Sequence, residues 1–227
     1  MTQLSLPIKI STHMTFANYI EFANSQIVQL LKQELKNNTT NFIYLWGNSS
    51  SGKTHLLQAS ALAAIDNNKK VAYLDFNKPI VDINLLDMIN FDLICLDNID
   101  NLNDKEQREL FELYNKVKLS TSKLIVSAKR PPKELEFSIN DIKTRLSFAL
   151  TFHLKNPNDE EKKIILEKKA TAKGLIIKNN IYKYLLNNQN RDLKFLLKII
   201  DKIDKKSIQE KKPITLNLLK QVLADYH

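Results

Sequence analysis

The sequence has very little cysteine, glycine and arginine, and each scarcity limits what the chain can be. A single cysteine, Cys95, stands inside an apolar run of this 227-residue chain, which excludes the disulfide framework of small secreted domains. No apolar run approaches the roughly 18 residues that a membrane-spanning helix requires. The N-terminus also lacks the charged and apolar regions of a secretory signal. These absences predict a cytoplasmic protein with no membrane partner.

Glycine and arginine occur at so few positions that each position is informative. Two of the three glycines, Gly47 and Gly52, lie in one short stretch, WGNSSSGKTHLL. The chain otherwise uses lysine for its surface charge, and its four arginines are Arg108, Arg130, Arg145 and Arg191. Because a guanidinium makes planar, two-pronged contacts that an ammonium cannot make, each arginine is a candidate for a specific role.

The positive charge is concentrated in the last third of the chain. Residues 1–154 have 17 basic and 16 acidic side chains, whereas residues 155–227 have 17 and 9, so most of the net charge of +9 lies there. This surplus is typical of a domain that lies near nucleic-acid phosphates, and it is equally typical of a lysine-rich solvated surface. Charge alone does not choose between the two.

Apolar runs alternate with helical patterns up to residue 154. The expected strands are residues 42–46, 71–76, 91–96, 124–127 and 149–154, and the expected helices are residues 25–36, 54–65, 82–89, 104–118 and 139–146. This alternation predicts a parallel sheet with helices on both faces. After Pro157 only helical patterns follow, and Asn158 or Asp159 is expected to cap the first of them. We expect a mobile arm over residues 1–12, a nucleotide-binding core over 13–155 and a helical domain over 156–227.

Residues 47–54 match the complete phosphate-binding pattern G-x-x-x-x-G-K-[ST] between an expected strand and an expected helix. Gly47 and Gly52 let backbone N–H groups, including that of Ser51, curl around phosphate oxygens, and the helix N-terminus adds its positive dipole end. Lys53 is expected to reach the outer phosphates, and Thr54 to ligate Mg²⁺. The pattern therefore predicts a site for ADP or ATP with Mg²⁺.

The expected third strand ends in an acid, as the second half of such a site requires. In LICLD the terminal Asp97 is expected to hold the Mg²⁺. The next residue is Asn98, whereas many ATPases of this class have a second acid there to orient the attacking water. An amide cannot accept the proton of that water, so nucleotide binding is well supported and hydrolysis by the chain itself is doubtful. The direction of the nearby Asp100 stays open.

The order of these motifs resembles that of AAA+ ATPases, and specifically of the DnaA-related proteins. TFANY (15–19) is similar to the segment that leads into the family's adenine pocket, and GKTHLL and LICLDNID resemble its two Walker motifs. KRPPKEL (129–135) follows the strand where the family keeps a polar sensor, and NRDLKFLLKIIDKI (190–203) is similar to its lid helix. The resemblance covers nearly the whole chain. It implies a P-loop AAA+ core with a parallel sheet flanked by helices, and a small all-helical lid domain.

Three features favour the Hda-type branch, the regulatory inactivators of DnaA. The printed chain ends at His227, where an initiator is expected to continue into a helix-turn-helix domain. Asn98 stands where the initiator has its second acid. Near the N-terminus, Gln3, Leu4 and Leu6 belong to QLSLP, which resembles the peptide that bacterial proteins insert into the sliding-clamp groove. A random polar start is the alternative interpretation of these five residues.

The resemblance also assigns roles to individual residues. In this family an arginine from one subunit completes the nucleotide site of its neighbour, and IKTRL (142–146) matches that segment, so Arg145 is the expected arginine finger. Such a finger is typically worth about 10³–10⁵ in rate. Arg191 matches the second sensor and is expected to face the chain's own nucleotide. Lys129 stands where the family often has an acid as first sensor, which again argues against independent hydrolysis.

These implications lead to two hypotheses. In the first, the chain is an adaptor that holds ADP and is tethered to the DNA polymerase III sliding clamp (beta subunit). It stimulates hydrolysis of DnaA-bound ATP and thereby inhibits replication initiation in the nucleoid. In the second, it is a self-sufficient AAA+ motor or helicase loader. The basic lid fits non-specific DNA contact in both, and AAA+ proteins commonly pair, so a homodimer is possible. A small-molecule kinase fits poorly, because a lid that holds substrate phosphates needs more arginine than the chain has.

Overall fold

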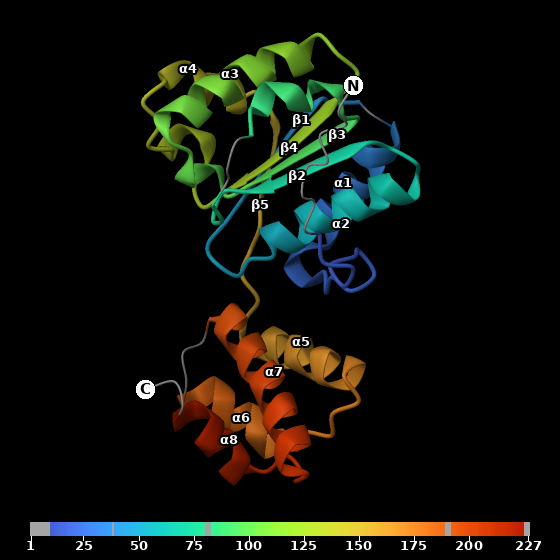
Figure 1. Cartoon of the computed structure of the whole chain (residues 1–227), viewed down its shortest axis with the longest axis vertical. Coiled ribbons are helices and arrows are strands. Elements are labelled where there is room, and N and C mark those ends of the chain that lie inside the picture. Colours follow the sequence, from blue (N-terminus) through green and yellow to red (C-terminus); the bar gives the residue numbers. More distant parts are fainter. Residues whose placement is uncertain (1–9, 38, 80–82, 189–191, 225–227) are drawn as a thin grey trace. The chain divides into compact units, whose positions relative to one another are not determined.

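The computed structural model describes residues 10–37, 39–79, 83–188 and 192–224. The chain forms two compact units, Met1–Asn156 and Pro157–His227 (Figure 1). Helices cover both faces of a five-stranded parallel sheet in the first unit, and the described part of the second unit contains helices and their connections. The expected fold class is therefore confirmed. Among the described helices, none combines the length and apolarity needed to cross a lipid bilayer.

The sheet has the strand order β2-β3-β4-β1-β5, and all neighbouring strands are parallel. Its strands are β1 (Phe42–Trp46), β2 (Val71–Asp75), β3 (Leu93–Asp97), β4 (Lys123–Ala128) and β5 (Leu150–His153). Trp46 at the end of β1 pairs with Ala128 of β4 and His153 of β5. Because parallel strands end at the same edge, the residues that follow β1, β3, β4 and β5 meet there, where open α/β sheets bind their ligands.

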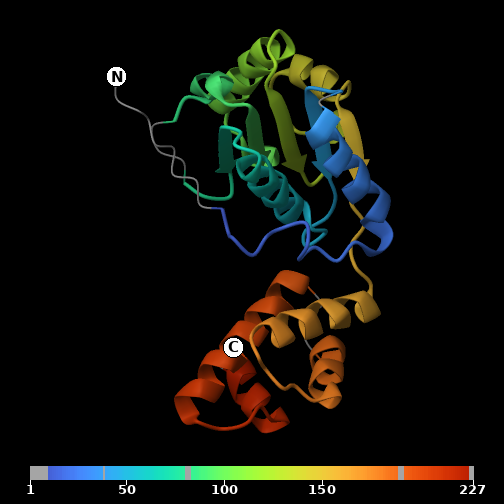
Figure 2. The ribbon, with the colours of Figure 1, turned by 90° about the vertical axis from the view of Figure 1, so that its right-hand side faces the viewer.

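Two helix layers cover the sheet. Helices α1 (Ser25–Asn37) and α2 (Lys53–Asp66) lie on one face (Figure 2). Helices α3 (Asp104–Lys118) and α4 (Asn140–Leu146) lie on the other. Short 3-10 helices fill the connections, namely η1 (Phe22–Asn24), η2 (Leu85–Asn90), η3 (Ile99–Asn101) and η4 (Pro132–Glu134).

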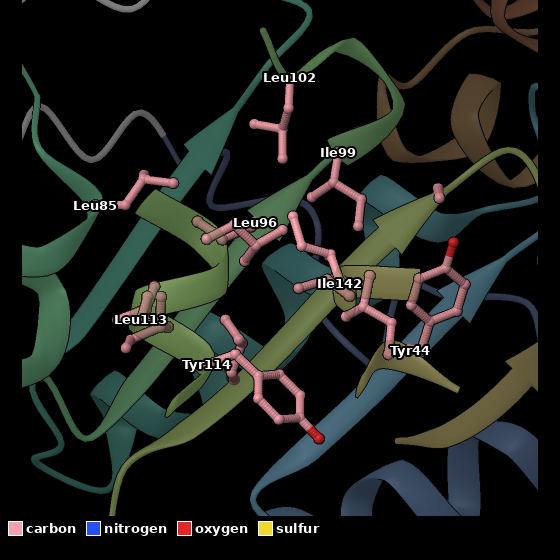
Figure 3. Packing of buried hydrophobic residues seen from close by; sticks show 14 of the residues in the cluster. Tyr44, Leu85, Leu96, Ile99, Leu102, Leu113, Tyr114 and Ile142 are labelled. Carbon is pink, nitrogen blue, oxygen red and sulfur yellow. The ribbon is translucent and has the colours of Figure 1, made fainter. Parts of the chain in front are cut away.

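Side chains alternate between the two faces of β1 and are buried on both. Tyr44 belongs to the apolar cluster under α3 and α4, which Figure 3 shows, whereas Ile43 and Leu45 belong to the cluster under α1 and α2. All three are almost completely buried. Burial on both faces explains why this strand reads as a continuous apolar run in the sequence.

Most expected elements are found with their bounds shifted by two residues or fewer, and the exception lies between β2 and β3. A helix was expected over residues 82–89, and the structure has the 3-10 helix η2 at Leu85–Asn90. It begins there because the Asn84 side chain accepts a hydrogen bond from the Leu86 N–H at 3.0 Å. Residues 80–82 lie outside the described part of the chain.

The second unit contains four helices in its described part, α5 (Asp159–Ala172), α6 (Asn179–Asn188), α7 (Leu193–Glu210) and α8 (Leu216–Ala224). They surround their own apolar cluster, to which α7 contributes Leu196, Ile200 and Ile203. Of the two candidates for the first cap, the structure selects Asn158, which forms a reciprocal capping box with Glu161.

Candidate nucleotide site and the Arg145 pocket

The loop at residues 47–52 connects β1 to α2 and has no room for side chains at its two glycines. A Cβ atom on Gly47 would lie 2.5 Å from the Leu154 carbonyl oxygen, and one on Gly52, whose φ is +96°, would lie 2.8 Å from the Tyr19 ring. Within the described part of the chain no side chain caps the start of α2, so its first N–H groups are available to an anion. The backbone geometry is that of a phosphate cradle.

Lys53 and Ser51 add two buried polar groups to this cradle. The Lys53 ammonium donates hydrogen bonds to the carbonyl oxygens of Gly47, at 2.6 Å, and Asn48, at 2.9 Å. Burial lowers the pKa of Lys53, while the nearby Asp97 carboxylate raises it. The Ser51 hydroxyl is buried and has no hydrogen-bond partner among the described residues. A buried cation and an unsatisfied hydroxyl beside an uncapped helix fit the phosphates of a nucleotide.

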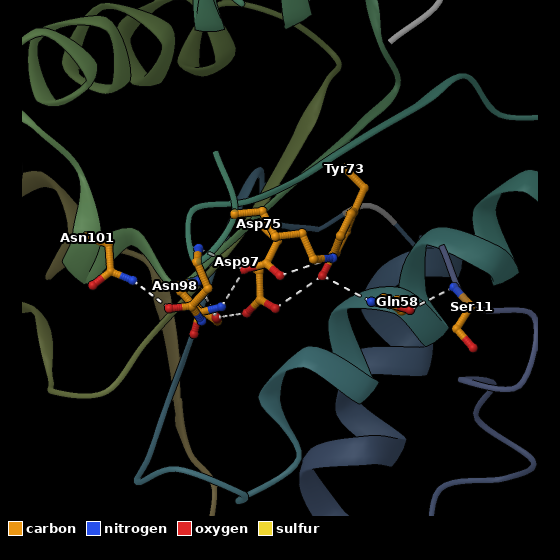
Figure 4. Close-up of polar contacts among 10 residues, drawn as sticks. Ser11, Gln58, Tyr73, Asp75, Asp97, Asn98 and Asn101 are labelled. Carbon is orange, nitrogen blue, oxygen red and sulfur yellow. Dashed lines mark hydrogen bonds and ion pairs between the residues drawn. The ribbon is translucent and has the colours of Figure 1, made fainter. Parts of the chain in front are cut away.

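Asp97 lies fully buried at the end of β3 and is held by three hydroxyl groups. The Ser127 hydroxyl donates to one carboxylate oxygen and the Tyr73 hydroxyl to the other, at 3.1 Å (Figure 4). The Thr54 side chain is also hydrogen-bonded to Asp97. Burial raises the pKa of Asp97, and the hydrogen bonds from Ser127 and Thr54 lower it. The structure thus brings together Thr54 and Asp97, the pair expected to serve Mg²⁺.

Tyr73 continues this network toward the N-terminal segment. Its hydroxyl accepts a hydrogen bond from Gln58 Nε2 at 3.2 Å, and Gln58 Oε1 accepts one from the Ser11 N–H at 3.0 Å (Figure 4). Burial raises the pKa of Tyr73, with Asp97 adding to the shift, so the phenol stays protonated and donates to Asp97. No motif or spacing pattern in the sequence identifies Tyr73 or Gln58 as part of the site. The one hint in the sequence is that each places a polar atom in a mostly apolar element, Tyr73 in β2 and Gln58 in α2.

Asn98 and Asp100 occupy the positions that bear on hydrolysis. Asn98 is in the left-handed region, with φ +61°, and its Nδ2 donates to Asp75 Oδ1 at 2.8 Å. One oxygen of Asp100 accepts the Lys129 N–H at 2.6 Å, and the other is buried without a partner in the described chain. The Lys129 side chain itself is exposed. The amide of Asn98 is therefore engaged with the end of β2.

Hydrogen bonds join the segment before α1 to the end of the first unit, and another joins the end of the first unit to the phosphate loop. Asn24 donates to the Lys155 carbonyl oxygen and accepts from the Lys155 N–H, both at 3.0 Å. Its Nδ2 also donates to the Tyr19 hydroxyl at 3.2 Å. Asn156 Nδ2 donates to the Ser49 carbonyl oxygen at 2.7 Å. The end of the first unit thus contacts the loop through Asn156, and Tyr19 lies against Gly52.

A stacked ring pair lies immediately before the loop. The Trp46 indole and the His153 imidazole are nearly parallel, at 8°, with their centroids 3.8 Å apart. The pair forms because β1 and β5 place these two residues opposite each other. The stacking holds the side chain of Trp46, the residue before Gly47, against His153.

Arg145 lies in a pocket of about 500 Å³, on α4. Its guanidinium donates to the Asn115 side-chain oxygen and stands over the Phe111 ring, 4.5 Å from the centroid. Phe42, the first residue of β1, also lines the pocket. The phosphate loop follows the last residue of β1, so the pocket and the loop lie at opposite ends of this strand, about 13 Å apart along its axis.

Four residues with expected roles lie outside the described residues. They are Arg191, the expected second sensor, and Gln3, Leu4 and Leu6, the expected clamp-binding residues.

Comparisons with known proteins agree with this geometry. The family of the bacterial DnaA ATPase domain matches residues 10–153, and the family described as the Hda lid domain matches residues 159–223. Domain III of the replication initiation protein DnaA from Thermotoga maritima is 22% identical, with a TM-score of 0.81 over 95% of this chain and 98% of that one.

Two further structures share the fold with lower TM-scores. AMPPCP-bound DnaA from Aquifex aeolicus is 23% identical, with a TM-score of 0.70 over 85% of this chain and 66% of that one. The Holliday junction branch migration motor RuvB from Thermotoga maritima is 14% identical, with a TM-score of 0.67 over 91% and 69%. With its DnaA-type ATPase core and Hda-type lid, the chain belongs to the DnaA-related AAA+ family, as a member of Hda type.

Proposed function

We propose that the chain inhibits replication initiation by stimulating hydrolysis of the ATP bound to DnaA, to whose nucleotide it presents Arg145. The proposal depends on the location of Arg145. Its guanidinium is held on α3 at the opposite end of β1 from the chain's own phosphate loop. Because the Arg145 guanidinium lies about 13 Å along the strand from that loop, we assign it to the nucleotide of another molecule.

The chain's own site holds ADP with Mg²⁺ in this proposal, as a structural switch. Lys53 and the loop N–H groups hold the phosphates, and Thr54 and Asp97 hold the metal. Bound Mg²⁺ supplies charge neutralisation on the phosphates. Slow hydrolysis of ATP in this site follows from Asn98, because its amide is bonded to Asp75 and cannot accept a proton from water.

Two tethers complete the proposed function. Gln3, Leu4 and Leu6 bind the groove of the sliding clamp, and the basic lid contacts the DNA that the clamp encircles, which places the protein in the nucleoid. Seventeen basic and nine acidic residues over 155–227 support the DNA contact. A clamp pull-down that Gln3→Ala and Leu4→Ala leave unchanged contradicts the first tether. Binding to duplex DNA without salt dependence contradicts the second.

The decisive experiment measures ATP turnover by the chain alone, by DnaA alone, and by both together with DNA-loaded clamp. We expect stimulated turnover only in the complete mixture, and its loss in Arg145→Ala. Arg130→Ala is the matched control, because Arg130 is an exposed arginine of the same unit that is paired with Glu136. Full stimulation by Arg145→Ala contradicts the proposal.

The second candidate function is a self-sufficient ATPase motor, and one observation favours it. One carboxylate oxygen of Asp100 is buried with no hydrogen-bond partner among the described residues, and the Asp100 charge raises the pKa of Lys53. A carboxylate close enough to act on Lys53 is a candidate proton acceptor in place of Asn98. Substantial turnover by the chain alone, removed by Asp100→Asn, identifies the motor.

A further inference from the structure

Two exposed apolar side chains lie in the Arg145 pocket or directly after one of its lining residues in the chain. Phe148, which lines the pocket, is 81% exposed, and Leu119, which follows Lys118 at the end of α3, is 89% exposed. Exposed apolar side chains that gather at one place, unlike scattered ones, mark an interaction surface.

The charges inside the pocket indicate what kind of partner covers this surface. Two cations, Arg145 and Lys118, line the pocket with a single carboxylate, that of Asp141. The Lys118 side chain has no hydrogen bond or ion pair with any residue that the structure describes. A partner that fits has an anionic group for the two cations and an apolar rim for the side chains around them.

We infer that Phe148 is an anchor that docks this surface onto the nucleotide-bearing face of DnaA, with Leu119 beside it and with Arg145 and Lys118 directed at the nucleotide's phosphates. The inference rests on the proposed function and adds the surface that achieves it. Nucleotide phosphates supply negative charge beyond that of Asp141, which leaves one of the two cations unbalanced. Aromatic side chains and arginines form the strongest contacts in protein interfaces, surrounded by residues that exclude water.

The anchor and the arginine have separable effects on the reaction. Phe148 carries no charge, so its loss weakens binding without removing the group that acts on the phosphates. We expect Phe148→Ser to raise the concentration that gives half-maximal stimulation of DnaA-bound ATP hydrolysis at least about tenfold, as for a typical anchor residue. The rate at saturation should be unchanged. Arg145→Ala should instead lower the saturating rate.

The matched control is Leu30→Ser, which removes a 45% exposed leucine from α1 on the other face of the sheet. Its stimulation curve should match that of the wild-type protein. Thermal unfolding of Phe148→Ser should also match the wild type, because an exposed side chain adds little to folding. Phe148→Leu, which keeps an apolar group, should regain most of the affinity.

Each result that contradicts these expectations overturns a different part of the proposal. A Phe148→Ser curve that overlays the wild-type curve, or one that loses only its plateau, overturns the anchor while the Arg145→Ala result upholds the proposed function. An unchanged plateau in Arg145→Ala overturns the proposed function itself. If sedimentation shows that Phe148→Ser dissociates a homodimer while DnaA binding is intact, the surface serves a second copy of this chain, and the inference is overturned.

Discussion

Replacing Asp97 with asparagine is expected to stabilise the nucleotide-free chain at neutral pH. Asp97 has no solvent exposure, and burial raises the pKa of its carboxyl group. At pH 7.5 the unfolded chain carries this charge in water, whereas folding moves the carboxyl group into the interior, where burial disfavours the charge. Each unit by which folding raises the pKa costs the folded state about 1.4 kcal/mol at that pH. Asparagine removes this cost, and its carbonyl oxygen still accepts hydrogen bonds from the surrounding hydroxyls.

The sign of the pH dependence follows from the same shift. Below the unfolded-state pKa of about 3.9, Asp97 is protonated in both states and has no cost. As the pH rises from there through the folded-state pKa, wild-type stability falls relative to the variant, and above it the difference is constant. For a chain of this size each 1 kcal/mol corresponds to about 2–4 °C in the unfolding midpoint.

The assay is urea unfolding of nucleotide-free protein at intervals between pH 7.5 and pH 4.5. Asp66→Asn, which changes an exposed carboxylate at the end of α2, is the control and should have little effect. A variant less stable than the wild type at pH 7.5, or a difference that is the same at every pH, would show that the hydrogen bonds of Asp97 outweigh its burial. With Mg²⁺ and ADP added, the wild type should gain more stability than the variant, because asparagine is a poorer metal ligand.

Three further substitutions test the site. Lys53→Ala should abolish nucleotide binding in calorimetry, because it removes the ammonium held at the loop carbonyls. Ser127→Ala should lower the free energy of unfolding in urea by about 1–3 kcal/mol, because the Asn98 N–H loses its hydrogen-bond acceptor inside the protein. Asn24→Ala should also cost about 1–3 kcal/mol, because it removes both bonds to Lys155, and a thermal midpoint equal to that of the wild type would contradict this.

The sheet and the phosphate loop were predictable because local pattern alone determines them. The apolar run of β1 and the helical spacing of α3 gave their bounds directly, and the loop pattern placed Lys53 and Thr54. Asp97 followed from its place at the end of a buried strand. Each of these signals lies within a few consecutive residues, so no knowledge of the fold was needed.

The partners of these residues were not predictable, because they come from distant parts of the chain. Ser127 reaches Asp97 only because β4 pairs with β3, with Val126 opposite Leu96. The contact between Arg145 and Asn115 likewise depends on how α4 packs on α3. A serine inside the apolar run of β4 was the one available hint, and it does not say which acid the hydroxyl meets.

The stacked pair of Trp46 and His153 has a practical consequence. The chain has a single tryptophan, so all of its indole emission reports on one place, the residue before Gly47. The imidazole that lies 3.8 Å away is a contact quencher of such emission, and any ligand that shifts the loop changes their overlap. Fluorescence of the unlabelled protein can therefore follow the filling of the phosphate loop in real time.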